Sequence, residues 1–319
     1  HRPGPVGGRG RGVSEGDGPV GFRSGFVSLV GRPNVGKSTL VNTIVGRKVS
    51  IVSNKPQTTR TQIRGLRTTA ASQIVLLDTP GIHRPRTLLG ERCNERSVET
   101  LREVDVVCLL VEADAAIGPG DRFIAGLVAA SGTPAILVVN KVDAAAPATV
   151  AERLASAAAL GDFAAFVPIS ARTGEGVDVL VGEIEGRLAE GPEYYPGGVV
   201  TDQPEAVLVA ELVRERLLAV AREELPHSIM VTAEPFDEDE VEADPARDEI
   251  LRFRVTIRVE RDSQKGIVIG RGGQVLRDAG TAARLEAEQL LGARVHLETR
   301  VRVDRDWQRR AHSLDRLGL

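Results

Sequence analysis

Apolar residues follow two different patterns along this chain of 319 residues. Between Gly25 and Gly191, short apolar runs alternate with segments that carry apolar residues at helical spacing, and five of the runs suit buried strands: FVSLV, QIVLL, VVCLLVEA, AILVVN and FVPIS. Strands that alternate with helices are typical of a doubly wound, mostly parallel α/β sheet. The pattern therefore predicts one α/β domain over residues 25–191.

The flanking segments differ from this domain. Residues 1–24 are rich in Gly, Arg and Pro, which predicts a disordered segment. Residues 192–204 concentrate Pro and Gly between periodic segments and are predicted to form a linker. Residues 205–319 then predict a helix, two strands, a glycine-rich turn, a second helix and a last strand. This order is that of a separate α+β domain with a C-terminal tail.

The composition of the chain is that of an ordinary globular protein. Apolar residues make up 42% of the chain and charged residues 27%, which is ordinary for a globular protein that is not embedded in a membrane. No apolar run approaches 18 residues, the first residues lack a signal-peptide core, and two cysteines give no disulfide framework, so a cytoplasmic location is expected.

The C-terminal part of the chain has an excess of positive charge. From Arg252 to Leu319 there are 15 Lys and Arg residues and 9 Asp and Glu residues. The excess, with Arg252, Arg254 and Arg258 on one face of a predicted strand, indicates an anionic partner.

The segment GRPNVGKS follows the strand-like run FVSLV and precedes a helix-compatible segment. In this context a glycine-rich loop cradles phosphates with backbone N–H groups, and the positive end of the helix dipole adds to the attraction. Lys37 is expected to reach the β- and γ-phosphates, and Ser38 to offer its hydroxyl to Mg²⁺. The predicted loop consists of Gly31, Arg32, Pro33, Asn34, Val35, Gly36, Lys37, Ser38 and Thr39.

The segment NKVD, Asn140 to Asp143, follows AILVV and lies beyond the carboxyl end of a predicted strand, where open α/β sheets bind ligands. A carboxylate at Asp143 can accept two hydrogen bonds from N1–H and the exocyclic amine of guanine, a pair that adenine lacks. The backbone of SAR, Ser170 to Arg172, can close over the base. The predicted ligands are GTP and GDP, and the base-binding residues are Asn140, Lys141, Asp143, Ser170, Ala171 and Arg172.

The segment DTPG lies between these motifs, after QIVLL. A Pro-Gly pair by itself usually marks an ordinary turn. In this position Asp78 is expected to hold Mg²⁺ through a water, and the N–H of Gly81 to bond the γ-phosphate. The loop of Asp78, Thr79, Pro80 and Gly81 can therefore distinguish a triphosphate from a diphosphate.

The order and spacing of these motifs resemble the translation-factor-like GTPases. The resemblance places the first switch at KPQTTR, Lys55 to Arg60, where a threonine ligates Mg²⁺ while the γ-phosphate is present. Likeness to relatives with a paired-threonine switch favours Thr59 over Thr58. The implied catalytic residues are Lys37, Thr59 and Gly81, and the implied Mg²⁺ ligands are Ser38, Thr59 and Asp78.

One position departs from the pattern of Ras-like proteins. Ile82 stands directly after the DxxG motif, where those proteins have a glutamine that orients the attacking water. We therefore expect slow intrinsic hydrolysis, with the water oriented by another group. GTPases with an asparagine at the position of Asn34 and a paired-threonine switch use a bound K⁺ in place of an arginine finger, which makes K⁺-stimulated hydrolysis our hypothesis. Arg60 and Arg84 are the alternative cations.

The segment GIVIGRGGQVL in the C-terminal part resembles the GxxG turn of a KH domain. Two short helices meet at such a turn, where glycines let the backbone of a single-stranded nucleic acid approach closely. The order of elements around it matches the type II KH arrangement, although Gly272 stands at a position that is often basic. The predicted RNA-binding residues are Arg258, Lys265, Gly270, Arg271, Gly272 and Gly273.

A GTPase domain followed by one type II KH domain is similar to the Era family of bacterial ribosome-assembly GTPases. That resemblance implies binding to the 30S subunit near the 3′ end of 16S ribosomal RNA, assistance in subunit assembly, and RNA binding that depends on nucleotide state. It also implies a peripheral association with the inner face of the cell membrane, for which the sequence has neither a lipidation motif nor an amphipathic basic helix. A monomer is expected.

Three other functions stay open at this point. The protein could be an RNA scaffold or chaperone in which GTP is a structural ligand, as the apolar Ile82 would suit. It could be related to tRNA-modification or tandem GTPases, although a single NKxD motif and a C-terminal KH pattern argue against a second GTPase domain. Its C-terminal domain could also bind a protein, with the arginines forming only a solvated face.

Overall fold

A computed structural model of the chain describes residues 21–55, 58–60, 62–221, 225–236 and 250–319. The chain forms two compact units. Unit 1 comprises the described residues up to 49, together with 61–84 and 93–202, and unit 2 comprises 50–60, 85–92 and 203–319. Of the segment predicted to be disordered, residues 1–20 lie outside the described residues, and the first strand begins at Arg23.

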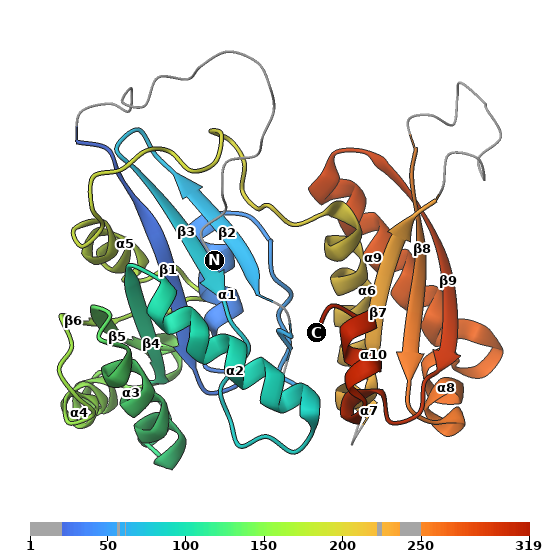
Figure 1. The fold of residues 1–319 in the computed structure, drawn as a ribbon, viewed down its shortest axis with the longest axis horizontal. Coiled ribbons are helices and arrows are strands. Elements are labelled where there is room, and N and C mark those ends of the chain that lie inside the picture. The colour runs from blue at the N-terminus through green and yellow to red at the C-terminus, as the bar shows by residue number, and fades with distance from the viewer. Residues whose placement is uncertain (1–20, 56–57, 61, 222–224, 237–249) are drawn as a thin grey trace. The chain divides into compact units, whose positions relative to one another are not determined.

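Unit 1 is built on a six-stranded sheet in the order β2-β3-β1-β4-β5-β6 (Figure 1). All neighbouring strands are parallel except β2, which pairs with β3 in antiparallel register. The strands are β1 (Arg23–Gly31), β2 (Ile63–Thr68), β3 (Ser72–Asp78), β4 (Val106–Glu112), β5 (Ala135–Asn140) and β6 (Ala165–Pro168). Five of them coincide with the predicted apolar runs, which confirms the α/β fold class.

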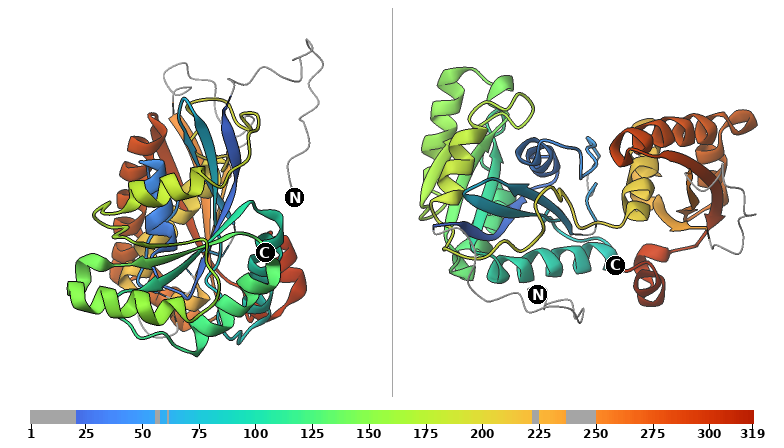
Figure 2. Two further views of the ribbon diagram at one scale, coloured as in Figure 1. Left: turned by 90° about the vertical axis from the view of Figure 1, so that its left-hand side faces the viewer. Right: turned by 90° about the horizontal axis from the view of Figure 1, so that it is seen from above.

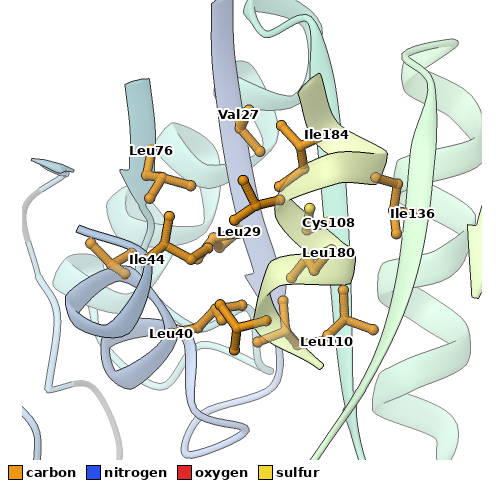
Figure 3. Close-up of a cluster of buried hydrophobic side chains, with 14 of the residues drawn as sticks. Val27, Leu29, Leu40, Ile44, Leu76, Cys108, Leu110, Ile136, Leu180 and Ile184 are labelled. Atoms are coloured by element: carbon orange, nitrogen blue, oxygen red, sulfur yellow. The ribbon is translucent and has the colours of Figure 1, made fainter. Parts of the chain in front are cut away.

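Helices cover both faces of this sheet (Figure 2), and this explains why the central strands are apolar along their whole length. One face packs on α1 and α5 in a core that includes Leu29, Leu40 and Leu180 (Figure 3). The other face packs on α2, α3 and α4. The helices are α1 (Lys37–Val45), α2 (Leu88–Glu103), α3 (Pro119–Ser131), α4 (Pro147–Ala158) and α5 (Val177–Glu185).

The predicted linker packs closely on unit 1. Gln73 is fully buried in β3, its amide oxygen accepts hydrogen bonds from the backbone N–H groups of Tyr194 and Tyr195, and its amide nitrogen donates to the carbonyl of Tyr195. Farther on, Val200 accepts a hydrogen bond from the N–H of Leu66 in the edge strand β2. Residues 194–202 therefore run along the sheet edge rather than free of it.

Unit 2 contains a three-stranded sheet in the order β7-β8-β9, with β7 and β8 antiparallel and β8 and β9 parallel. Its core packs α6, α8 and α9 against one face of β8. This is the predicted α+β order, to which the structure adds the short helices α7, α8 and α10. The elements are α6 (Glu205–Val220), α7 (Leu225–Ser228), β7 (Met230–Pro235), β8 (Ile250–Val259), α8 (Asp262–Ile269), α9 (Gln274–Leu291), β9 (Arg294–Val303) and α10 (Ala311–Arg316).

Helices long and apolar enough to cross a bilayer are missing from the part of the chain that the structure describes. The segment 234–249 is rich in Asp and Glu, and residues 237–249 of it lie outside the described part of the chain.

The hydrogen bonds of Gln73 to the linker should contribute measurably to the free energy of unfolding. Gln73→Leu should keep the volume but leave the backbone groups of Tyr194 and Tyr195 without partners, at a cost of about 2 kcal/mol in the free energy of unfolding. The chain's two tyrosines are these two linker residues, so they contribute, together with Trp307 and the phenylalanines, to near-ultraviolet circular dichroism during urea unfolding. Gln62→Leu, which removes one hydrogen bond to Thr100, is the control. Equal stabilities of the two variants would contradict the linker's anchoring.

Candidate nucleotide site and glycine turn

The predicted phosphate loop connects the end of β1 at Gly31 with the start of α1 at Lys37. Asn34 and Gly36 adopt positive φ angles of 67° and 99°, so the loop curls tightly before the helix begins. The buried Lys37 ammonium donates to the carbonyls of Gly31 and Arg32, at 3.2 and 3.1 Å. Burial lowers the pKa of Lys37 to about 8, and Asp78 opposes this shift. The loop thus holds a cation inside a ring of backbone groups.

Asn140 ties this loop to the predicted base-binding segment. Its side-chain nitrogen donates to the carbonyl of Val35 at 2.8 Å, and its oxygen accepts from the N–H of Ala171 at 2.9 Å. Gly36 lies directly against it, because a Cβ at this position would overlap the Asn140 side-chain nitrogen. The structure therefore brings together three of the predicted segments through one buried carboxamide.

The DTPG segment follows β3 and lies against the phosphate loop. Asp78 is fully buried at the strand end, and the Thr79 hydroxyl donates to the carbonyl of Leu29 at 2.8 Å. A Cβ on Gly81 would stand 2.9 Å from the backbone nitrogen of Pro33, so glycine permits this approach of the two loops. Ile82 is buried in the core beside them and has no polar atom with which to orient a water.

Asp143 lies just after β5 with two partners from the SAR segment. The Ser170 hydroxyl donates to its carboxylate at 2.6 Å, and the Arg172 guanidinium pairs with its second oxygen. The hydrogen bond from Ser170, followed by the charge of Arg172, lowers the pKa of Asp143 against the opposing effect of burial. Since the folded-state pKa is lowered, the carboxylate stays ionised at neutral pH.

Two acidic residues that the sequence analysis did not identify complete this region. Asp121, almost fully buried near the start of α3, accepts a hydrogen bond from Arg32 at 2.8 Å. Glu112, at the end of β4, pairs with Arg32 at 3.7 Å and with Lys141. Asp121 lies in the first turn of α3, a position that a sequence pattern can identify because acidic residues are favoured there. Its pairing with an arginine 89 positions away has no local signature.

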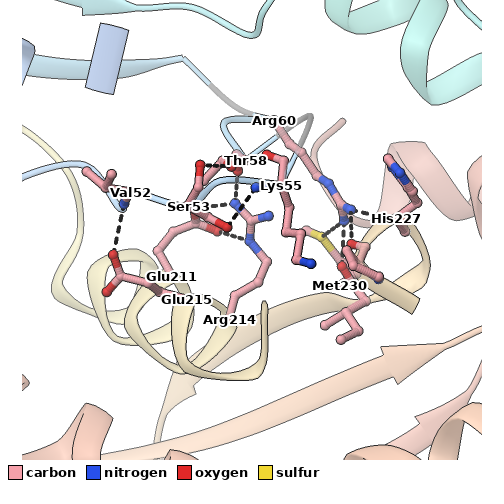
Figure 4. A network of polar contacts seen from close by, with 12 residues as sticks. Val52, Ser53, Lys55, Thr58, Arg60, Glu211, Arg214, Glu215, His227 and Met230 are labelled. Carbon is pink, nitrogen blue, oxygen red and sulfur yellow. Dashed lines mark hydrogen bonds and ion pairs between the residues drawn. The ribbon is translucent and has the colours of Figure 1, made fainter. Parts of the chain in front are cut away.

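The predicted first switch belongs to unit 2, although it lies between α1 and β2 in sequence. Of the segment KPQTTR, residues 56 and 57 lie outside the described residues. Thr58 donates to the carbonyl of Lys55 at 2.7 Å, and Thr59 is buried. Arg60 is also buried, and its guanidinium donates to the carbonyls of three residues in unit 2 (Figure 4): Pro226, His227 and Ile229. The Arg60 guanidinium is therefore held by backbone carbonyls of unit 2.

The glycine turn joins α8 to α9 as the KH pattern predicts. Gly270, Gly272 and Gly273 all have positive φ angles, of 75°, 59° and 76°. A Cβ on Gly270 would stand 2.5 Å from a methyl of Val275, so the turn has room only for glycine there. Arg271 is exposed beside the turn. Arg277, which the sequence analysis did not identify, donates from α9 to the carbonyl of Gly272 at 2.7 Å.

The two remaining predicted RNA-binding residues lie in different places. Lys265 is half-buried on α8, the helix that leads into the turn. Arg258 lies on β8, where its neighbours Ile257 and Val259 face the helices. Because side chains alternate along a strand, Arg258 points to the face of the sheet opposite α8 and α9. The structure therefore does not group Arg258 with the turn.

Comparison with known proteins agrees with both parts of the chain. The family model described as 50S ribosome-binding GTPase matches residues 26–141, and the KH domain model matches residues 224–308. The curated GTPase Era of Mycobacterium sp. (strain JLS) is 51% identical over 300 residues, which cover 93% of this chain and 99% of that protein.

Two solved structures are similar over nearly the whole chain, each with 37% identity and with 92% of this chain and 98% of the other covered. One is a point variant of Aquifex aeolicus Era bound to GDP·AlF4⁻, with a TM-score of 0.86. The other is Era in complex with MgGDPNP and nucleotides 1506–1542 of 16S ribosomal RNA, with a TM-score of 0.85. With a GTPase domain, a KH domain and relatives that match over nearly their whole length at this identity, the chain belongs to the Era family of GTPases.

Proposed function

We propose that the chain hydrolyses GTP at the loops described above and binds 16S ribosomal RNA near its 3′ end during assembly of the 30S subunit. Residues 25–191 would form the GTPase domain, 192–204 the linker and 205–319 the RNA-binding domain. The relative in complex with MgGDPNP and a 16S ribosomal RNA segment supports this function. The protein would act in the cytoplasm as a monomer, and the membrane contact implied by the family would be an additional, peripheral association.

At the nucleotide, each predicted residue has a distinct task in this proposal. Lys37 and Gly81 contact the γ-phosphate, while Ser38, Thr59 and Asp78 hold Mg²⁺ when the triphosphate is bound. Asp143 reads guanine, with Asn140 and the SAR segment shaping the base site. What supports these tasks is that the phosphate loop, DTPG and NKVD segments contact one another through small, buried groups. Asn34, exposed in the loop with its positive φ, would ligate K⁺.

The position of the first switch is the observation that carries the proposed link between nucleotide and RNA. Arg60 donates to Ile229 at 2.6 Å and to His227 at 2.9 Å, and its guanidinium lies 5.4 Å from the centre of the Trp307 ring. Trp307 is itself fully buried and donates to the carbonyl of Ser228. The carbonyls at the end of α7 thus attract a cation and an indole N–H together, which is favourable at the negative end of a helix.

A second group of contacts connects the switch segment to α6. Glu215 accepts a hydrogen bond from the N–H of Val52 at 2.8 Å, and Arg214 donates to the carbonyl of Thr58 (Figure 4). On the other side of α6, Arg216 pairs with Glu286 of α9 at 2.6 Å. A contiguous series of contacts therefore runs from the switch through α6 to the helix that follows the glycine turn.

Residues 85–92, which follow the DTPG segment, also belong to unit 2. Arg92, in the first turns of α2, donates to the Asp315 carboxylate at 2.6 Å and to the carbonyl of Leu319 at 2.7 Å. In GTPases the γ-phosphate orders both switch regions, and hydrolysis releases them. Because both regions here have contacts in unit 2, the nucleotide state can bias unit 2, and RNA bound there must bias nucleotide binding equally.

Replacing Arg60 tests this link. Arg60→Ala should leave the affinity for GDP unchanged and reduce the ratio of RNA affinities between the GTP-analogue and GDP states towards one, since the anchor at α7 is lost. Fluorescence titration with RNA from the 3′ end of 16S ribosomal RNA measures the ratio. Arg47→Ala, which changes an exposed arginine beyond α1, is the control.

Arg60→Lys distinguishes loss of coupling from loss of folding, because it keeps the charge but not the forked geometry, and it should give an intermediate ratio. An Arg60→Ala protein that folds and retains the ratio of the unmodified protein would refute the link through the switch.

The phosphate loop can be tested with two glycines of similar backbone conformation. Gly36→Ala should lower GDP affinity by about tenfold or more, since its Cβ would displace Asn140, a loss of roughly 1.4 kcal/mol. Gly46, at the end of α1, has a φ of +75° with no atom within 4 Å of an added Cβ. Gly46→Ala therefore carries the backbone strain alone and should leave GDP affinity unchanged. Calorimetric titration that found equal affinities for both variants would disprove the role of Asn140.

The K⁺ hypothesis has its own variant. Hydrolysis should be faster in KCl than in NaCl by about tenfold, and Asn34→Gly should remove this difference, because glycine keeps the positive φ and deletes the amide ligand. Steady-state phosphate release at equal ionic strength measures both rates. Equal rates in the two salts for the unmodified protein would rule out K⁺ stimulation.

A further inference from the structure

Charged side chains of alternating sign form a row beside the phosphate loop. Asp121, at the start of α3, accepts a hydrogen bond from Arg32 at 2.8 Å. Glu112, the last residue of β4, pairs with Arg32 at 3.7 Å through one carboxylate oxygen and with the Lys141 ammonium through the other. Glu112 therefore lies between a cation of the phosphate loop and a cation of the base-binding segment.

Acidic side chains at this place oppose the binding of phosphates. The loop between Gly31 and Lys37 is predicted to bind an anionic ligand, and a carboxylate close to it repels that ligand. The side chain of Glu112 is 18% exposed and that of Asp121 only 1%, so the solvent screens their charges incompletely. Attraction of the nucleotide gives no reason for two acids here, whereas their cationic partners do.

Asp121 has a structural task in addition to its pairing with Arg32. Its second carboxylate oxygen accepts a hydrogen bond from the N–H of Gly118 at 2.8 Å, which closes the first turn of α3. The Arg32 side chain packs on the same turn, since a Cβ on Gly120 would stand 3.0 Å from its Cδ. Among the described residues, by contrast, the side chain of Glu112 forms ion pairs or hydrogen bonds with the two cations only.

Lys141, the lysine of the NKVD segment, depends on Glu112 for its side-chain position. Its backbone has a positive φ of 69°, a conformation that residues with a side chain rarely adopt. The preceding Asn140 is fixed by the phosphate loop and by the N–H of Ala113, which follows Glu112. The Lys141 side chain itself is 34% exposed and is paired with Glu112. Without this pair its long stem would sample several rotamers.

We propose that Glu112 is a positioning residue of the nucleotide site, which orders Lys141 at the base and Arg32 in the phosphate loop before the nucleotide binds. This inference rests on the proposed function, in which both segments contact GTP. It adds a residue outside the predicted nucleotide motifs that raises the affinity for GDP and GTP alike. Side chains that are ordered beforehand lose less conformational entropy on binding, and this gain outweighs the repulsion between the carboxylate and the phosphates.

Two variants that remove the same charge test the proposal. Glu112→Gln and Asp114→Asn each remove one negative charge with little change in volume, two residues apart. Asp114 is exposed and has no hydrogen bond or ion pair among the described residues. Repulsion alone predicts that both variants bind GDP slightly more tightly. Positioning predicts that Glu112→Gln binds GDP about fivefold more weakly than Asp114→Asn, as calorimetric titration of the nucleotide-free proteins would measure.

A third variant shows whether Glu112 acts through the lysine. Lys141→Met keeps the stem and removes the ammonium, so adding Glu112→Gln to it should weaken GDP binding by about twofold at most. In steady-state hydrolysis, Glu112→Gln should raise the KM for GTP about fivefold and change kcat little, because Lys141 belongs to the base-binding segment. Without nucleotide, Glu112→Gln should unfold at about the same temperature as Asp114→Asn, since the ion pair is partly exposed.

The opposite results are equally clear. If Glu112→Gln binds GDP as tightly as Asp114→Asn or more tightly, Glu112 is not a positioning residue. A loss of affinity that is just as large in the Lys141→Met protein would also overturn the proposal. If the unmodified protein binds neither GDP nor GTP, the proposed function itself is wrong, whatever the variants do.

Discussion

The carboxamide of Asn140 holds together the loops that the sequence predicts to bind the nucleotide. Its two polar atoms bond to Val35 and Ala171, so the loop after β1 and the loop after β6 are held at a constant separation. A buried amide with both ends satisfied is costly to replace, because an apolar side chain would leave a carbonyl and an N–H without partners. The glycines follow from this constraint, since Gly36 leaves space for the amide and Gly81 lets a third loop approach Pro33.

Sequence alone predicted those parts of the molecule that have local signatures. The five parallel strands are continuous apolar runs, and each nucleotide motif directly follows a strand, so their positions could be inferred from chain order. The edge strand β2 was missed because IRGLRT has only two apolar side chains in six. The packing of residues 194–202 was missed for a related reason, since its main anchor is the polar residue Gln73.

The switch segment shows a different limit of prediction. A motif identifies Thr59 by its resemblance to other GTPases, but nothing near Arg60 in sequence indicates that its partners are the carbonyls of residues 166 to 169 positions away. In the same way, alternation along β8 predicted a basic face, whereas the place of Arg258 relative to the glycine turn follows only from the position of the helices.

Burial of the Lys37 ammonium also affects how many protons the protein binds near neutral pH. A pKa of about 8 for Lys37 means that an appreciable fraction of molecules carry a neutral amine just above neutral pH, and more do so as the pH rises. An arriving phosphate favours the charged form, so nucleotide binding above neutral pH is accompanied by proton uptake from the solvent. The heat of binding measured in that pH range then includes the ionisation of the buffer.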